Sequence, residues 1–406
     1  MNSRILAQHR FLVLLRSICG LEIFMAPIIT VFYLDYVHID FKTFAFYQSF
    51  VMIAAACLEV PTGAFADVYG RKKTFLVAQI IYFLALTVLV VFPGILSLVA
   101  ASVLLPVAIS LGSGNFEAII YESFAKNDSL PDYKSLMERS YAISLVIGIL
   151  AALCGGYLAK KSIIFPVLLD CLSIFVVTLC CLFFLHDTHA NRDGSVGSHI
   201  KESHQRITQT ILLVAKSPSL LSLIMSMGSI FAVVRGIFVS YQPLLLAVGL
   251  SYDSLGTIFA AFGVISAIFA YGVPKFSAKS GNVIPKRMTV GLALILIVSA
   301  VLFQINDFFA VFAAIGLHQV VRGIFLPYFR FHINTNVGTD FTSRATLLSV
   351  VSLASSGICA LAIFLVGMIE SQMSLASAVS IVTVLFAVMA ALPWLFAEFR
   401  VSRNAA

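Results

Sequence analysis

Long apolar segments alternate with short polar turns along almost the whole chain of 406 residues. A nearly uncharged segment of about 18 or more residues can cross the roughly 30 Å hydrocarbon core of a membrane as a helix. Twelve segments meet this condition, with approximate bounds 9–36, 44–66, 75–93, 97–124, 138–159, 163–185, 218–247, 254–274, 288–305, 308–331, 344–369 and 374–397. A helix pairs its backbone N–H and C=O groups internally, as a segment inside lipid must. The short turns leave little chain for a soluble domain. The pattern therefore predicts an all-α polytopic membrane protein with twelve transmembrane helices.

Only one polar stretch between the apolar segments is long, and it covers residues 186–217. It divides the chain into an N-terminal six-helix bundle at 1–185 and a C-terminal six-helix bundle at 218–406, joined by a cytoplasmic linker. The linker contains several histidines, which raises the alternative of a metal site: His186, His189, His199 and His204. Their irregular spacing among Ser, Gly and Asp favours a solvated tether, so we expect neither a metal nor a cofactor.

Composition agrees with a membrane protein, since 60% of the residues are hydrophobic and only 11% are charged, against about 25% charged in a typical soluble domain. Basic residues accumulate in short cytoplasmic loops. With the N-terminus inside, twenty lysines and arginines fall on the cytoplasmic side, and only Lys42, Lys160 and Lys161 fall outside. We therefore expect a multi-pass protein of the inner (cytoplasmic) membrane with both termini in the cytoplasm. The net charge of +7 then reflects this topology and contact with anionic lipid rather than nucleic-acid binding.

The loop between the second and third segments carries the most specific motif of the chain. It reads Gly63-Ala64-Phe65-Ala66-Asp67-Val68-Tyr69-Gly70-Arg71-Lys72-Lys73. Three further motifs accompany it, namely Glu59-Val60-Pro61-Thr62-Gly63, Tyr121-Glu122-Ser123 and Arg344-Ala345-Thr346-Leu347-Leu348-Ser349. Together with twelve helices in two halves, these motifs resemble the major facilitator superfamily, and more narrowly one bacterial branch of it. The resemblance covers essentially the whole chain and implies a transporter that works by alternating access.

The same resemblance implies a conformational lock on the cytoplasmic side. Gly63 is expected to let helices 2 and 11 approach closely, as small residues do in membranes, and Gly70 to permit a tight turn. Asp67 is expected at the positive N-terminal end of helix 11, and Arg71 is expected to pair with Glu122 at the end of helix 4. In the family such a lock holds the outward-facing state.

The chain departs from the family pattern in two places. Val68 stands where a basic residue is common, which weakens the expected lock. Ala151 and Ala152 stand where the antiporter motif of the family has Gly-Pro, which disfavours proton/drug antiport.

Ionisable residues within the apolar segments are costly, about 2.5 to 3.5 kcal/mol each on insertion scales, and usually serve a partner or a substrate. The set comprises Glu22, Glu59, Glu117, Asp170, Arg235, His318 and Arg322. In the superfamily fold, helices 1, 4, 7 and 10 line the central cavity. That placement predicts a substrate-binding set of Glu22, Glu117, Arg235, His318 and Arg322. Guanidinium groups bind carboxylate or phosphate in a bidentate manner, so the basic C-terminal half favours an anionic group.

Two alternatives apply to these residues. Arg235 or Arg322 could neutralise Glu22 or Glu117 as a structural ion pair instead of binding substrate. A carboxyl group in apolar surroundings can load and unload a proton near neutral pH, which makes Glu22 and Glu117, with Glu59 third, candidates for proton coupling. We interpret Asp170 as structural. The prolines inside the segments are expected to bend them: Pro27, Pro106, Pro243 and Pro327.

The preferred function is that of a proton-coupled secondary transporter, a monomer, which moves a small polar or anionic organic molecule such as a carboxylate metabolite or siderophore. The alternative is a proton-driven exporter of drugs and other amphiphiles. An enzyme is not expected, because none of the common hydrolase or metalloprotease motifs occurs in the sequence.

Overall fold

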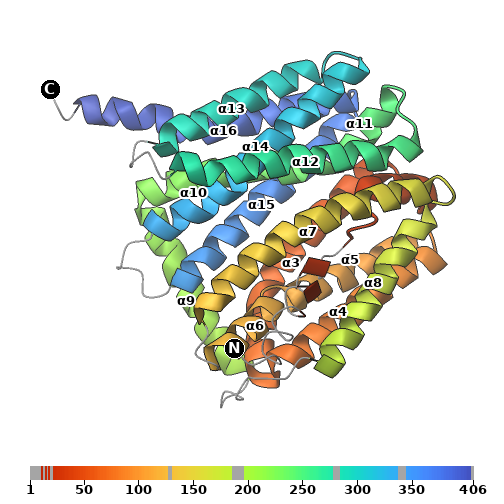
Figure 1. The fold of residues 1–406 in the computed structure, drawn as a ribbon. Helices are drawn as coiled ribbons and strands as arrows, with labels where there is room; N and C mark the ends of the chain where they lie inside the picture. Colours follow the sequence, from red (N-terminus) through yellow and green to blue (C-terminus); the bar gives the residue numbers. More distant parts are fainter. Residues whose placement is uncertain are drawn as a thin grey trace. The chain divides into compact units, whose positions relative to one another are not determined.

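The computed structural model describes residues 11, 14–15, 17–18, 22–126, 130–184, 196–277, 284–336 and 344–403. Within this part of the chain the regular structure is helical, without a strand (Figure 1). Among the described residues, ten helices are long and apolar enough to cross a membrane, and two shorter apolar helices lie at Ala26–Tyr36 and Arg287–Leu302. These twelve helices correspond to the twelve predicted segments, which confirms the predicted fold class.

The helices assemble into two compact units. Unit 1 comprises Met1–Ile39, Ala54–His204 and Tyr252–Ala260, and unit 2 comprises Asp40–Ile53, Gln205–Ser251 and Ala261–Ala406. Helices α3, α9 and α12 each contribute to both units. The division into bundles at 1–185 and 218–406 stays a prediction.

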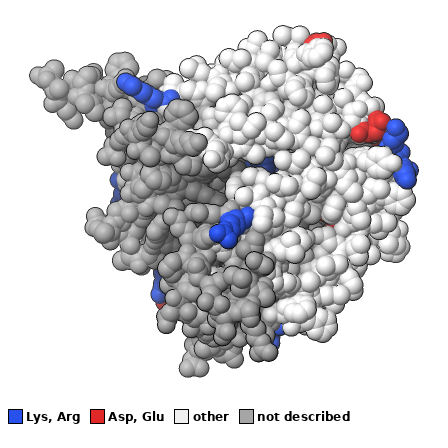
Figure 2. All heavy atoms as spheres, in the orientation of Figure 1, with Lys and Arg blue, Asp and Glu red and all other residues white. Residues whose placement is uncertain are grey.

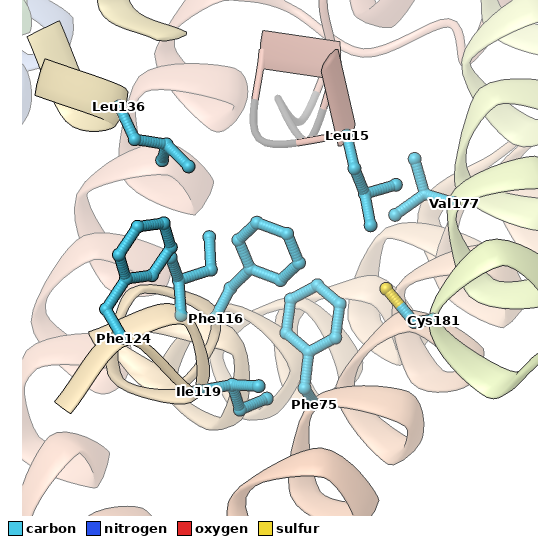
Figure 3. Packing of buried hydrophobic residues seen from close by; sticks show 9 residues of the cluster. Leu15, Phe75, Phe116, Ile119, Phe124, Leu136, Val177 and Cys181 are labelled. Carbon is cyan, nitrogen blue, oxygen red and sulfur yellow. The ribbon is translucent and has the colours of Figure 1, made fainter. Parts of the chain in front are cut away.

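Unit 1 is built mainly from α3 (Phe41–Tyr69), α4 (Arg71–Val91), α5 (Ile95–Gly112), α6 (Asn115–Lys126), α7 (Leu130–Ala159) and α8 (Ile164–Phe184). Helix α4 packs against α5, α8 and α6. A buried apolar cluster joins the first segment of the chain to α4, α6, α7 and α8 (Figure 3), and includes Leu15, Phe75, Phe116, Leu136 and Val177. This cluster fixes α6, the helix that carries Glu117.

The fourth predicted segment, 97–124, is not one continuous helix. Helix α5 ends at Gly112, Ser113 is extended, and α6 begins at Asn115. Gly114 between them has φ +71°, in the left-handed region that only glycine adopts without strain. The predicted span at 97–124 agrees with the apolar span Ile95–Tyr121, and the Gly112-Ser113-Gly114 sequence is the physical reason for the interruption inside it.

The first predicted segment, 9–36, is also interrupted. Residues 22–25 form a turn, and a 3-10 helix at Ala26–Ile28 leads into a short α-helix, Ile29–Val31, and a π-helix, Phe32–Tyr36. Glu22 has φ +58°, a conformation that costs an L-residue about 1–2 kcal/mol. Pro27 lies in the first turn after the break, a position that tolerates proline, so the expected bend at Pro27 stays a prediction.

Unit 2 contains α9 (Val196–Lys216), α10 (Pro218–Phe231), η3 (Ala232–Gly236), η4 (Ile237–Ser240), α11 (Tyr241–Ala247), α12 (Tyr252–Ser277), α13 (Ile284–Leu302), α14 (Phe308–Asn336), α15 (Arg344–Glu370) and α16 (Leu375–Arg403), with α9 and α12 shared as described. Helix α16 packs against α10 and α13, and α13 also packs against α14. Within the seventh predicted segment, 218–247, the α-helix α10 is followed by a π-helical turn, η3, and a 3-10 helix, η4. Such irregular turns are frequent at functional sites.

The second part of the linker predicted at 186–217 is a regular helix, α9, and most of its described side chains are exposed. Val214 near the end of α9 packs with Ile224 of α10 and with Leu347, Val350 and Val351 of α15. Apolar residues at helical spacing, which bury one face, therefore outweigh the polar composition of this stretch. His204 is exposed on α9, whereas His186 and His189 lie outside the described residues.

Large apolar side chains cover much of the described surface. Leu96, Phe309 and Tyr271 are 83%, 76% and 74% exposed. The face shown in Figure 2 is mostly uncharged where it is described, with most of the charged side chains near its margins. A soluble protein does not expose apolar patches of this extent, so this surface suits contact with lipid.

Candidate functional site

The unwound turn of the first segment carries Glu22, one of the predicted site residues. Its side chain is half-buried and forms a side-chain hydrogen bond with Tyr82 of α4. Tyr82 is 2% exposed. The carboxyl group therefore lies in a largely enclosed environment, against a buried hydroxyl group.

The backbone of the same turn is held by Asp170 of α8. The Phe24 N–H donates to one carboxylate oxygen of Asp170 at 3.2 Å, and the Met25 N–H donates to the other at 2.8 Å. Asp170 is 1% exposed. Its carboxylate thus satisfies two N–H groups at the break, as a capping residue does at the start of a helix.

Glu117 lies in the first turn of α6, directly after the break at Ser113 and Gly114. Its side chain is half-buried, and the neighbouring Phe116 belongs to the apolar cluster of unit 1. The two acids that the sequence places in helices 1 and 4 thus both occur at helix interruptions. Discontinuous helices near the bilayer midplane are common places for substrate and ion sites in transporters.

Glu59 lies inside the continuous helix α3 and is half-buried. Thr62, one turn later, donates to the Leu58 carbonyl at 2.8 Å and lies 3.2 Å from the Ser110 carbonyl of α5. This part of α3 is therefore tied to α5 of the same unit.

Arg235 lies in the π-helical turn η3, near the middle of the apolar span Leu220–Ala247. Its side chain is exposed, although the adjacent Val234 and Gly236 are buried. The guanidinium carbon lies 5.9 Å from the centre of the Phe238 ring, within the range of a cation–π contact. Phe238 in turn meets Tyr241 edge to face, with ring centres 5.7 Å apart.

His318 of α14 is completely buried between helices. Its Nδ1 lies 2.9 Å from the Tyr241 hydroxyl, and its Nε2 lies 2.8 Å from the Ser299 hydroxyl. Ser299 also donates to the Leu296 carbonyl at 2.6 Å, an arrangement that favours the tautomer in which Nε2 carries the proton and Nδ1 accepts from Tyr241. Both ring nitrogens are therefore occupied, and direct contact of His318 with substrate stays a prediction.

Arg322 lies one turn after His318 on α14. Its side chain is exposed, whereas the adjacent Val321 and Gly323 are buried. Its charge acts on the Tyr241 hydroxyl, so Tyr241 connects His318 and Arg322 with Phe238 and Arg235. These residues define the arginine–aromatic cluster of unit 2.

The sequence profile described as the Major Facilitator Superfamily matches residues 12–357. The chain belongs to the major facilitator superfamily.

Individual members of the superfamily resemble this chain at low sequence identity. The uncharacterised MFS-type transporter YxaM of Bacillus subtilis (strain 168) is 26% identical over 264 residues, 64% of each chain, so the match spans less than two thirds of that relative. A crystal structure of a mutant of the nucleoside transporter NupG has a TM-score of 0.75 at 14% identity, covering 96% of this chain and 98% of that one. A D-xylose-proton symporter has a TM-score of 0.70 at 13% identity, covering 95% and 96%. These identities show a common fold alone, and the family points to a transporter rather than an enzyme.

The loop motif typical of the superfamily is partly described. Gly70 has φ +96° and precedes α4, so the tight turn there requires glycine. Arg71 lies 3.8 Å from the Asp67 carboxylate, within the motif itself. The side chain of Glu122 is outside the described residues, so its pairing with Arg71 stays a prediction. A Cβ at Gly63 would meet no described atom within 4 Å, and the close packing of helices 2 and 11 there also stays a prediction.

Sequence reasoning missed the tyrosines that organise both groups of charges. Tyr82 and Tyr241 are completely or almost completely buried, and each contacts an ionisable residue. A polar hydroxyl in the middle of an apolar segment was the available signal, because a buried tyrosine usually needs a hydrogen-bond partner.

Proposed function

We propose that this chain is a secondary active transporter that works by alternating access and binds a small organic anion at Arg235 and Arg322. The observation that carries the proposal is the exposure of these two arginines within apolar spans, between buried neighbours. An arginine that faced lipid there would be costly, whereas one that lines a water-filled path is common in transporters. Arginine suits such a role, because its planar guanidinium group matches the geometry of an anionic carboxylate or phosphate.

The surroundings of the arginines favour a carboxylate on a flat or partly apolar molecule. Phe238 and Tyr241 offer aromatic surface beside the guanidinium groups. Guanidinium forms parallel hydrogen bonds with a carboxylate, and an aromatic or planar ligand can stack on the same surface. A carboxylate metabolite or a carboxylate siderophore has this combination of groups.

Proton coupling is the second part of the proposal. Glu22 and Glu117 are the candidate carriers, because each lies at an interruption of a membrane helix and is half-buried. Glu59 is the third candidate. The fold shared with a D-xylose-proton symporter is compatible with this mode of coupling. We further propose a monomer in the inner membrane, with both termini in the cytoplasm.

The test is ligand-induced thermal stabilisation of the purified protein by benzoate, salicylate, citrate, glycine betaine and tetraphenylphosphonium. A ligand at a hundred times its dissociation constant adds about 2.7 kcal/mol to the folded state. We expect a carboxylate to stabilise the wild type and Arg287→Gln, and to lose this effect in Arg235→Gln and Arg322→Gln. Arg287 is a matched control, since it is an exposed arginine at the start of α13.

Stabilisation by tetraphenylphosphonium that persists in both arginine variants would favour the alternative, an exporter of amphiphilic drugs. Carboxylate stabilisation of equal size in all four proteins would refute the anion site.

A further inference from the structure

The interruption of the first helix is held from two sides by residues of unit 1. On one side the Asp170 carboxylate accepts the Phe24 and Met25 N–H groups at 3.2 and 2.8 Å. On the other side Gly155 of α7 touches the backbone of Phe24, where a Cβ on residue 155 would overlap the carbonyl oxygen and lie 3.0 Å from the carbonyl carbon. Helix α8 thus holds the N–H groups of Phe24 and Met25, and helix α7 packs against the carbonyl group of Phe24.

This arrangement determines where the Glu22 side chain lies. Glu22 directly precedes the held peptides and adopts φ +58°, a strained conformation that persists only when its surroundings enforce it. Without the contacts from Asp170 and Gly155, α-helical geometry would be the more stable conformation of this turn. A return to that geometry would rotate residue 22 on the helix and move its carboxyl group away from Tyr82.

We infer that Asp170 is a positioning residue for transport, which together with Gly155 clamps the unwound turn and thereby places the Glu22 carboxyl group. This inference rests on the proposed role of Glu22 in proton coupling. It replaces the interpretation of Asp170 as merely structural.

The clamp also responds to protonation of Asp170. An ionised carboxylate offers acceptors to both N–H groups, whereas a protonated carboxyl has one oxygen that donates instead. Among the described residues, Glu22 in the turn, Tyr82 of α4 and Cys171 of α8 interact electrostatically with Asp170, and Tyr33 of the π-helical turn interacts with Tyr82. Protonation of Asp170 or Glu22 therefore changes the hydrogen bonds and charges that hold the turn.

The first readout is amide hydrogen exchange of the peptide 22–28 in detergent or nanodiscs, corrected for the intrinsic effect of pH. Loss of a hydrogen bond to a charged acceptor should speed exchange at least about tenfold. We expect this acceleration in Asp170→Asn, which retains one acceptor oxygen, and in Gly155→Ala, which displaces the Phe24 carbonyl without touching Asp170. Gly148→Ala is the matched control, because it lies on the same helix and a Cβ there meets no described atom within 4 Å.

The second readout is modification of Glu22 by dicyclohexylcarbodiimide, which reacts with protonated carboxyl groups in apolar surroundings, followed across pH by mass spectrometry. Glu59 in the same molecule serves as the internal standard. In Asp170→Asn and Gly155→Ala, we expect the Glu22 to Glu59 ratio and the pH midpoint of Glu22 to change, while Gly148→Ala matches the wild type.

A lowered melting temperature with unchanged exchange at 22–28 and unchanged Glu22 modification would overturn the inference, since Asp170 would then only stabilise the fold. If Asp170→Asn does not fold, Gly155→Ala decides alone. Absence of Glu22 modification in the wild type at every pH would contradict the proposed proton role of Glu22, and hydrogen exchange would still decide whether the clamp exists.

Discussion

The contact between α7 and the start of α12 in unit 1 leads to a sharp prediction. Gly156 and Gly256 pack backbone to backbone, so that a Cβ on residue 256 would lie 2.5 Å from the Ala152 carbonyl oxygen and 2.7 Å from the Gly156 Cα. Ordinary van der Waals contact begins at 3.4 Å. The substitution Gly256→Ala therefore requires the two helices to separate by about 0.9 Å, the difference between 3.4 and 2.5 Å.

Overpacking of this kind costs roughly 1–3 kcal/mol, and the cost applies only to the state in which the two helix ends touch. A state with separated ends is unaffected, so its population relative to the touching state should rise about 5- to 150-fold. Gly272→Ala is the matched control on the same helix, because a Cβ there meets no described atom within 4 Å.

The assay is pulsed dipolar spectroscopy between spin labels at positions 160 and 253, whose native side chains, Lys160 and Asp253, form an ion pair at 3.1 Å. Removal of this exposed pair costs at most about 1 kcal/mol, and it is common to the variant and the control. We expect Gly256→Ala to move the distance distribution towards longer separations. An unchanged distribution in both Gly256→Ala and Gly156→Ala would refute the reasoning.

Two further predictions concern single hydrogen bonds. Ser299→Ala should destabilise the protein by about 1–3 kcal/mol, because it leaves the buried Nε2–H of His318 without its acceptor. In a denaturation assay, Ser299→Thr should recover most of this lost stability. Equal stability of Ser299→Ala and the exposed-site control Ser371→Ala would contradict the assigned hydrogen bonds of His318. At the start of α3, the Thr43 N–H donates to the Asp40 carboxylate at 2.8 Å, and hydrogen bonding by Thr43 holds the pKa of Asp40 below its usual value of 3.8. Because the pKa is lowered, this stabilisation is present above pH 3.8 and is lost as the pH falls through the folded-state pKa. Protection of the Thr43 amide from hydrogen exchange should therefore fall in acid in the wild type but not in Asp40→Ser. The same acid response in Asp40→Ser would exclude the Asp40 carboxylate as its cause.

The sequence was sufficient for the helices whose pattern is local. Segments such as 163–185 coincide with α8, Ile164–Phe184, because an apolar stretch of membrane length decides both ends. The break after Gly112 was not predicted, although the two glycines that flank Ser113 were a local signal for it. Helix α9 was not predicted, because the polar composition of 196–216 suggested a tether and outweighed the helical spacing of its apolar residues.

The interruption at Glu22 could not be read in the same way. It depends on Asp170, which is 146 residues from Phe24 in the chain, and on a contact with Gly155 of α7. The enclosure of His318 likewise depends on Tyr241 and Ser299, which come from other helices. Local patterns identify ionisable residues at membrane depth, but only tertiary packing decides which of them are enclosed.

The left-handed conformation of Glu22 has a consequence for protein engineering. A glycine would adopt φ +58° without strain, so a search for more stable variants would favour replacing this glutamate. The same replacement removes the carboxyl group that the clamp places beside Tyr82. Stability-guided redesign of this transporter should therefore leave position 22 unchanged, because there the backbone and the proposed chemistry favour different amino acids.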